Sequence, residues 1–296
     1  LSLHDALPIL WAPLITPFRA DGTLDLPSLD KLTRHLAHAG LDGLVVCGTT
    51  GEPATLTMEE KAQVLSTVQG AASGLPLVMG VTGVAPAAVA GECRQWSSHG
   101  VAGFLVPPPA YVRPSQEGIV HFYRQVADQG GAPLIVYDIP YRTGVTLSLG
   151  TLLALADMPG VQAVKDCGGD AHKTQALIAD GRLQVLAGED HQIFGTLCQG
   201  GAGAIAASAH LQADLFVAMH AALRNGELAQ ARGLHHALAP LIRALFSEPN
   251  PGPLKAALAA QGLITSPTVR APLTPASATT VQWLAQAMDA VRCTPN

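Results

Sequence analysis

The chain has few charged residues, few aromatic residues and no paired cysteines. Charged residues make up 13% and aromatic residues 4% of its 296 residues, and the formal net charge is −5. Without a basic run or a basic-aromatic stripe, the chain is unlike a nucleic-acid-binding protein. No apolar run reaches the ~18 residues of a membrane span, so we expect no membrane partner. The five cysteines are scattered without a Cys-x-x-Cys pair, which indicates a reduced, cytoplasmic setting and not a disulfide framework.

A metal site is not expected either. The 11 histidines include no His-Glu-x-x-His and no comparable spacing, which are the usual patterns of metal ligands. His235 and His236 lie in a polar helical stretch, where surface histidines are the simpler interpretation.

The chain does have a repeated alternation of apolar runs with helical periodicity. Near-continuous apolar strands separated by helices are typical of a parallel sheet covered on both faces. Eight such units in about 220 residues match the count and size of an α/β fold of the (β/α)8 TIM-barrel type. The expected strands are 9–15, 43–47, 76–81, 102–106, 133–137, 161–165, 183–187 and 203–206, and examples of the helices between them are 26–38, 58–71, 85–98 and 116–129.

The two ends of the chain differ from this pattern. From residue 212 onward no strand-like alternation occurs, and helical stretches at 213–224, 227–246, 253–261 and 277–291 are separated by proline-containing loops. We therefore predict a barrel over 9–224 and an appended C-terminal helical segment over 225–296. Residues 1–8 have no initiator Met and no cationic region, so they do not resemble a signal peptide. We expect them to be a foreign or mis-started leader.

The strand at 161–165 ends on Lys165, one of only five lysines in the chain. Removing an ammonium from water without a partner is costly, and burial lowers the pKa of such a group. The resulting neutral amine can attack a carbonyl. An ion pair with Asp166, Glu189 or Asp190 is the alternative interpretation, because structural ion pairs also perturb pKa values.

Other polar residues follow the carboxyl ends of the expected strands, where a barrel of this kind has its active site. The sequence Gly-Thr-Thr-Gly at 48–51 would present backbone N–H groups and hydroxyls to a carboxylate or phosphate, although it is also a plain turn. Tyr137 ends the fifth strand, and a half-buried aromatic with a satisfied hydroxyl is the alternative there. Together with Lys165, these groups predict an enzyme that forms a Schiff base with a 2-oxo acid. Further candidates at strand ends are Tyr111, Arg142 and Gly188.

Four motifs give a resemblance to a known family. They are Gly-Thr-Thr-Gly-Glu at 48–52, Tyr-Asp-Ile-Pro-Tyr-Arg-Thr-Gly at 137–144, Val-Lys-Asp at 164–166 and Glu-Pro-Asn-Pro at 248–251. In this order and spacing they resemble the dihydrodipicolinate synthase / N-acetylneuraminate lyase family, from about Ile9 to the carboxyl end. The paired threonines, the arginine and the last motif are closer to the 4-hydroxy-tetrahydrodipicolinate synthase branch. The lyase branch typically carries Ser-Thr in the first motif and lacks the arginine.

The resemblance implies a covalent reaction without a cofactor. Pyruvate would form an imine with Lys165 and then condense with L-aspartate 4-semialdehyde, the step that opens lysine and diaminopimelate biosynthesis. Its carboxylate would lie against Thr49 and Thr50, near the backbone of Ile205, and Gly188 would also line the substrate site.

The resemblance also implies a proton relay and an assembly. Tyr137 would transfer protons in a relay with Thr49 and Tyr111. Tyr111 would reach the site from a neighbouring subunit, so we expect a homo-oligomer, either a dimer or a dimer of dimers such as a homotetramer. Arg142 would bind the carboxylate of the aldehyde substrate through its planar donor fork.

Some positions depart from the family pattern. Asp138 stands where Asn is usual and Tyr141 replaces a small residue, and both could reshape the pocket for the second substrate. An ion pair of Arg142 with Asp138 or Glu189 is the structural alternative to substrate binding. The positions of the lysine-feedback site in regulated members are here Val84, Ala88 and Ala110, so free lysine is not expected to inhibit.

Two other functions stay open from the sequence. One is a Schiff-base aldolase or dehydratase acting on a 2-oxo-3-deoxy sugar acid or another hydroxylated 2-oxo acid, which Lys165 and Tyr137 would serve equally well. The other is a barrel that binds a small carboxylate without turnover. Retention of lysine, tyrosine and threonine together disfavours the second.

Overall fold

The eight strands of the chain form a closed barrel in chain order, β1 to β8. This computed structural model describes residues 9–292, so the expected leader at 1–8 lies outside the described residues. The predicted (β/α)8 barrel with helices after it is confirmed, and the strand ends differ from the predicted ones by no more than two residues. The strands are β1 (Ile9–Pro13), β2 (Gly43–Val46), β3 (Leu77–Gly80), β4 (Gly103–Val106), β5 (Leu134–Asp138), β6 (Val161–Asp166), β7 (Gln184–Ala187) and β8 (Gly203–Ile205).

The chain divides into two compact units, which we describe separately. Unit 1 consists of Leu1–Ile9 and Pro76–Ile205, and unit 2 of Leu10–Leu75 and Ala206–Asn296. The predicted boundary between barrel and C-terminal segment, at residues 224 and 225, stays a prediction.

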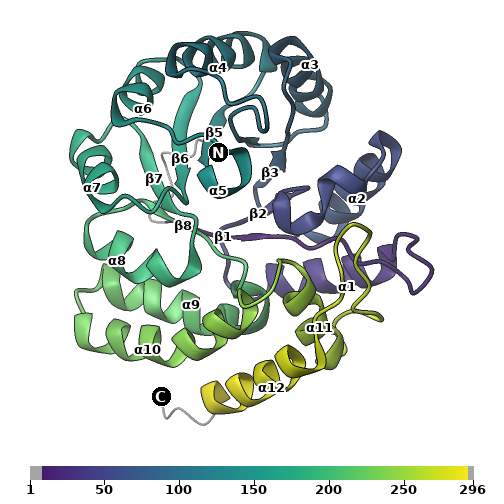
Figure 1. Cartoon of the computed structure of the whole chain (residues 1–296). Helices are drawn as coiled ribbons and strands as arrows, with labels where there is room; N and C mark the ends of the chain where they lie inside the picture. The colour runs from purple at the N-terminus through teal and green to yellow at the C-terminus, as the bar shows by residue number, and fades with distance from the viewer. Residues whose placement is uncertain (1–8, 293–296) are drawn as a thin grey trace. The chain divides into compact units, whose positions relative to one another are not determined.

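Unit 1 contains β3 to β8, and the pairings from β3 to β8 are all parallel. Almost every residue of these strands is buried, as expected for strands covered on both faces. Helices α3, α4, α6 and α7 follow one another along the outer side of the strands (Figure 1). The helices of this unit are α3 (Pro86–Ser97), α4 (Gln116–Gly130), α5 (Pro140–Thr143), α6 (Leu149–Ala156), α7 (Ala171–Asp180) and α8 (Ile193–Cys198), with a short turn η3 (Asp190–Gln192).

Unit 2 contains β1, β2 and two groups of helices. α1 packs on α2, and α10 packs between α9 and α12 (Figure 1). α2 begins with a capping box, in which the Thr57 side chain accepts from the backbone of Glu60 and the Glu60 side chain accepts from the backbone of Thr57. The elements are α1 (Leu26–Ala37), α2 (Met58–Ala71), α9 (Ala209–Arg224), α10 (Leu228–Leu245), α11 (Gly252–Ala260) and α12 (Ala278–Arg292), with turns η1 (Thr49–Gly51) and η2 (Pro53–Thr55).

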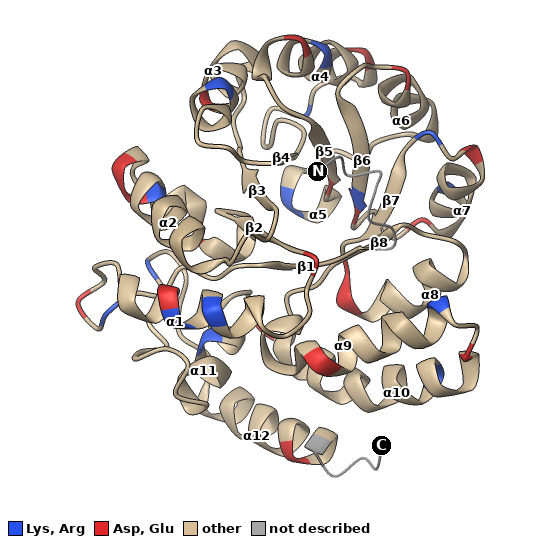
Figure 2. Cartoon of the chain, turned by 180° about the vertical axis from the view of Figure 1, so that it is seen from behind, with Lys and Arg blue, Asp and Glu red and all other residues tan. Residues whose placement is uncertain are grey.

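Lys and Arg residues, and Asp and Glu residues, occur at scattered positions along the helices and loops, and most of the ribbon consists of other residues (Figure 2). Across residues 9–292, none of the helices has the length and apolar character needed to cross a bilayer. The same residues contain no cluster of three His, Cys, Asp or Glu side chains that could hold a metal ion.

Candidate active site

Lys165 lies near the carboxyl end of β6, beside Tyr137 on β5. The two residues are partners in the register of these parallel strands. Lys165 is only 6% exposed, and its Nζ lies 4.5 Å from the centre of the Tyr137 ring. Within residues 76–205 it forms no ion pair. The alternative in which Lys165 pairs with an acidic neighbour is therefore not what the structure shows.

The acidic neighbours of Lys165 have other partners. Asp166 accepts hydrogen bonds from the Thr174 hydroxyl at 2.5 Å and from the backbone N–H of Gly168 at 2.8 Å. Glu189 accepts a hydrogen bond from the Tyr141 hydroxyl at 3.0 Å. These contacts leave the amine of Lys165 uncommitted to either carboxylate. A buried amine in that state can react with a carbonyl compound.

Gly188 allows the end of β7 to approach Lys165 closely. A Cβ at this position would lie 2.3 Å from Sγ of Cys167 and 3.0 Å from Cγ of Lys165. Only glycine fits without moving the lysine stem. Burial raises the pKa of the Cys167 thiol, so this thiol stays protonated and does not compete as a nucleophile.

Arg142 lies on α5, the short helix that follows β5. Its guanidinium carbon is 5.7 Å from the centre of the Tyr141 ring, and within residues 76–205 it forms no ion pair. The expected alternative, an ion pair with Asp138 or Glu189, is absent because Asp138 binds Lys173 and Glu189 binds Tyr141. The guanidinium is therefore available to an anion from solution.

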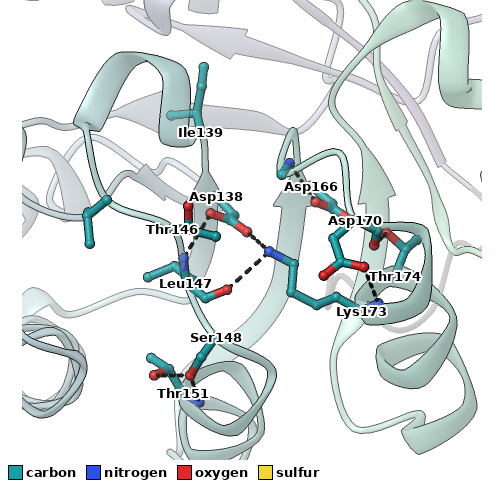
Figure 3. A network of polar contacts seen from close by, with 12 residues as sticks. Asp138, Ile139, Thr146, Leu147, Ser148, Thr151, Asp166, Asp170, Lys173 and Thr174 are labelled. Atoms are coloured by element: carbon teal, nitrogen blue, oxygen red, sulfur yellow. Dashed lines mark hydrogen bonds and ion pairs between the residues drawn. The ribbon is translucent and has the colours of Figure 1, made fainter.

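Asp138 is directed at α7 and not at Arg142. Its side chain is fully buried, and Oδ2 lies 2.5 Å from Nζ of Lys173 (Figure 3). Lys173 also donates to the carbonyl oxygen of Leu147 at 3.1 Å. Burial raises the pKa of Asp138, and the ammonium of Lys173 opposes that effect. Asp138 was named from the sequence, but its ion pair with Lys173 was not predicted.

Tyr111 projects away from the rest of the chain. Its side chain is 94% exposed, and its backbone has a left-handed φ of 72°. The backbone N–H of Tyr111 donates to the carbonyl of Thr143 at 3.2 Å, which fastens this loop to α5. A left-handed conformation is unfavourable for a non-glycine residue. Tyr111 nevertheless has this conformation, and its ring makes almost no contacts in its own chain.

In unit 2, Thr49 and Thr50 form a tight 3-10 turn, η1, directly after β2. Thr50 is buried and Thr49 is half-buried. The turn is held by the Thr16 hydroxyl, which donates to the carbonyl of Gly51 at 2.7 Å. A Cβ at Gly51 would lie 3.0 Å from the carbonyl oxygen of Leu14, so a larger residue would push the turn outward.

The C-terminal segment holds this turn in place. The side-chain amide of Asn250 donates to Oγ1 of Thr50 at 3.0 Å. Because that oxygen accepts from Asn250, the Thr50 hydroxyl proton remains available to another acceptor. Nζ of Lys255 lies 2.5 Å from Oε1 of Glu52, which follows the turn, and the backbone N–H of Arg270 donates to the same carboxylate at 2.9 Å.

In the sequence, Asn250 is predicted only as part of a family motif, and Lys255 is not among the predicted site residues. Lys255 is fully buried, and burial lowers its pKa to about 8 despite the opposing effect of Glu52. The signal that pointed to Lys165 was also present here, since Lys255 is a scarce lysine inside an apolar helical stretch. Ile205, the remaining predicted residue, is the buried last residue of β8.

The chain is similar to a known protein family and to known proteins over most of its length. The model of the dihydrodipicolinate synthetase family matches residues 7–291. A 4-hydroxy-tetrahydrodipicolinate synthase of Moorella thermoacetica is 38% identical over 278 residues, which are 93% of this chain and 95% of that protein.

Solved structures agree with the family match. The crystal structure of the dihydrodipicolinate synthase of Thermotoga maritima is 31% identical and superposes with a TM-score of 0.92 over 97% of this chain and 99% of that one. A chloride-inhibited dihydrodipicolinate synthase of Acinetobacter baumannii, in complex with pyruvate, is 32% identical with the same TM-score and coverage. The family model, the Moorella relative and the solved structures each cover nearly the whole chain. The chain therefore belongs to the dihydrodipicolinate synthetase family.

Proposed function

We propose that this protein condenses pyruvate with L-aspartate 4-semialdehyde to 4-hydroxy-tetrahydrodipicolinate, through a Schiff base on Lys165. The observation that carries the proposal is the buried amine of Lys165, which contacts Tyr137 and has no ion pair in its unit. The relatives named as 4-hydroxy-tetrahydrodipicolinate synthases support the choice of substrates.

The first stage forms the covalent intermediate. The neutral amine of Lys165 attacks the keto carbon of pyruvate, and the carbinolamine loses water to give a protonated imine. A proton must reach the departing hydroxyl, and the phenol of Tyr137, whose ring lies against the amine, is the group that we assign to this transfer. Tyr137 therefore acts as general acid at this stage.

The second stage forms the carbon–carbon bond. The positive imine nitrogen accepts the electrons of a methyl C–H bond, and loss of the proton gives an enamine. The enamine carbon attacks the aldehyde carbon of the semialdehyde, and the alkoxide that forms takes up a proton. The amino group of the new chain then attacks the imine carbon, which closes the ring and releases Lys165 as a free amine.

Two anion sites hold the substrates in this proposal. Thr49 and Thr50 would bind the pyruvate carboxylate through hydroxyl and backbone N–H groups, and the Asn250 contact leaves the Thr50 proton free for this purpose. In unit 1, the backbones at Gly188 and Ile205 would line the substrate site. Arg142, which has no carboxylate partner in its unit, would bind the carboxylate of the semialdehyde.

Tyr111 supports an oligomeric form of the enzyme. A ring that is 94% exposed on a left-handed loop contributes nothing to the core of its own chain. We assign it to the active site of a neighbouring subunit, where it would extend the proton relay of Tyr137 and Thr49. A homodimer is the smallest assembly that satisfies this, and sedimentation of the wild-type protein beside a Tyr111→Phe variant would measure it.

Borohydride trapping tests the covalent step. The protein is incubated with pyruvate and sodium borohydride, digested, and searched for a carboxyethyl group on Lys165. The expected result is an adduct in the wild-type protein and none in a Lys165→Ala variant. A protein that only binds carboxylates would give no adduct, and this result would overturn the proposal.

A coupled assay tests the second substrate. Pyruvate with aspartate semialdehyde is run beside a panel of 2-oxo-3-deoxy sugar acids, and turnover of the semialdehyde is expected to dominate. Turnover of the panel alone would assign the same Schiff-base chemistry to an aldolase or dehydratase.

A further inference from the structure

A buried ion pair lies immediately behind the two residues that carry the proposed chemistry. Asp138 follows Tyr137 on β5, and Asp166 follows Lys165 on β6. Asp138 and Asp166 are register partners, as are Tyr137 and Lys165. Because successive residues of a strand point to opposite faces, both acids face the helices while the tyrosine and lysine face the other side.

Both acids are bound by the first turn of the same helix, α7. Lys173 pairs with Asp138 at 2.5 Å, and the hydroxyl of the next residue, Thr174, donates to Asp166 at 2.5 Å (Figure 3). The turn itself is fixed by Asp170, whose side chain accepts from the backbone N–H of Lys173 at 3.1 Å. One rigid turn therefore determines the position of two strand ends.

The packing around the pair leaves little freedom. The exposed fraction is 4% for the Lys173 side chain and 0% for that of Asp138. A Cβ at Gly168 would lie 2.7 Å from Nζ of Lys173 and 2.8 Å from Oδ2 of Asp138. Leu147 also binds both partners, since its carbonyl accepts from Lys173 and its N–H donates to Asp138 at 3.5 Å.

We propose that Asp138 and Lys173 are a positioning pair for the reaction, which sets the distance between the Tyr137 phenol and the Lys165 amine through the ends of β5 and β6. Neither residue contacts the substrate in this inference. It rests on the proposed function, because it concerns proton transfer between the groups assigned there. A displacement of about 1 Å between reacting groups is enough to lower a rate by about a hundredfold.

The variants Asp138→Asn, Lys173→Met and the double variant test the pair. Each single change leaves one buried group without its charged partner, and the double change removes both charges. We expect each single variant to lose about tenfold to a hundredfold in kcat, with a much smaller change in the KM for pyruvate. The double variant is expected to recover most of that loss.

Two further variants separate the effect of geometry from the effect of losing a charge. Gly168→Ala keeps both charges but moves them apart, so it is expected to lower kcat with the charges intact. Arg182→Met is the control, because it removes ion pairs at the surface of the same unit, with Asp157 and Asp180. Its kcat is expected to equal that of the wild type.

The measurements are kcat, KM, the rate of borohydride trapping with pyruvate, and circular dichroism at the assay temperature. Folded single variants that keep wild-type kcat and trapping rate would overturn the inference and leave the pair a structural feature only. Failure of the proposed function would look different, because the wild-type protein itself would then give no pyruvate adduct.

Discussion

The substitution Lys255→Met is expected to destabilise the protein strongly, because it breaks a fully buried ion pair. Lys255 and Glu52 are both 0% exposed as side chains, and their charged atoms are 2.5 Å apart. The same ammonium lies 4.1 Å from the centre of the Phe18 ring, and the guanidinium of Arg270 lies 4.4 Å from that centre. Removing the lysine leaves Glu52 buried among groups arranged for its charge.

The magnitude follows from what remains around Glu52. Removing one partner of a buried pair typically costs about 3–5 kcal/mol. Glu52 keeps the hydrogen bond from the backbone N–H of Arg270, so we place the loss at the lower end, about 3 kcal/mol. With a urea dependence of about 3 kcal/mol per molar for a chain of this size, the unfolding midpoint should fall by about 1 M.

The assay is urea unfolding followed by circular dichroism, with two reference variants. Arg34→Met removes an exposed ion pair with Asp30 in the same unit, and should leave the urea midpoint nearly unchanged because solvent screens this pair. The double variant Glu52→Gln with Lys255→Met removes both charges and should recover most of the stability. The reasoning would be refuted if Lys255→Met lost no more stability than Arg34→Met.

Three further predictions follow from single sites. Arg142→Ala should lower kcat/KM for the aldehyde by about tenfold to a hundredfold or more, since each hydrogen bond to a charged group is worth about 1.5–3 kcal/mol, while borohydride trapping with pyruvate stays unchanged. His210 is fully buried and hydrogen-bonded at both ring nitrogens, and burial lowers its pKa to about 4. The unfolded state then binds more protons, so stability should fall as the pH drops from about 6.5 to about 4, by up to about 3 kcal/mol; urea midpoints across this range should be flatter for His210→Gln. Free lysine should leave the steady-state rate unchanged at millimolar concentration, because Val84, Ala88 and Ala110 offer no polar groups to bind it, and strong inhibition in the same assay would contradict this.

The barrel could be predicted from sequence because each strand has its own local signal. An apolar run such as 161–165 is bounded by glycine and proline. The cap of α2 is a local motif too, because it consists of a threonine followed three residues later by a glutamate. The elements α5 and α8 are only 4 and 6 residues long. A helix of one turn has no periodicity to detect, so these elements could not be predicted from the pattern alone.

The ion pairs that support the site could not be predicted in the same way. Asp138 and Lys173 are 35 residues apart, and Glu52 and Lys255 are 203 apart. No local pattern connects such positions, and each partner alone looks like a charged residue at the end of a strand or on a helix. Lys165 could be singled out because it ends a predicted strand and other polar residues follow the ends of neighbouring predicted strands, while the pairing of Lys173 and Lys255 depends on the folded chain.

The contrast among the three most buried lysines gives the sharpest test of the proposed chemistry. Lys165, Lys173 and Lys255 are each 6% exposed or less. Lys173 and Lys255 each donate to a carboxylate at 2.5 Å and to a backbone carbonyl, and these contacts restrain the amine from reaching a carbonyl compound. Lys165 has an aromatic ring in that place.

All three side chains are buried, and Lys165 is the one that forms no ion pair with a carboxylate among residues 76–205. If reactivity followed burial alone, pyruvate and borohydride would label all three lysines. If reactivity instead requires that the amine has no ion pair with a carboxylate, peptide mapping should find the carboxyethyl group on Lys165 and none on Lys173 or Lys255. A reduced adduct on either of the paired lysines at a comparable level would contradict the assignment of the nucleophile, because the ion pairs would then not restrain the amine.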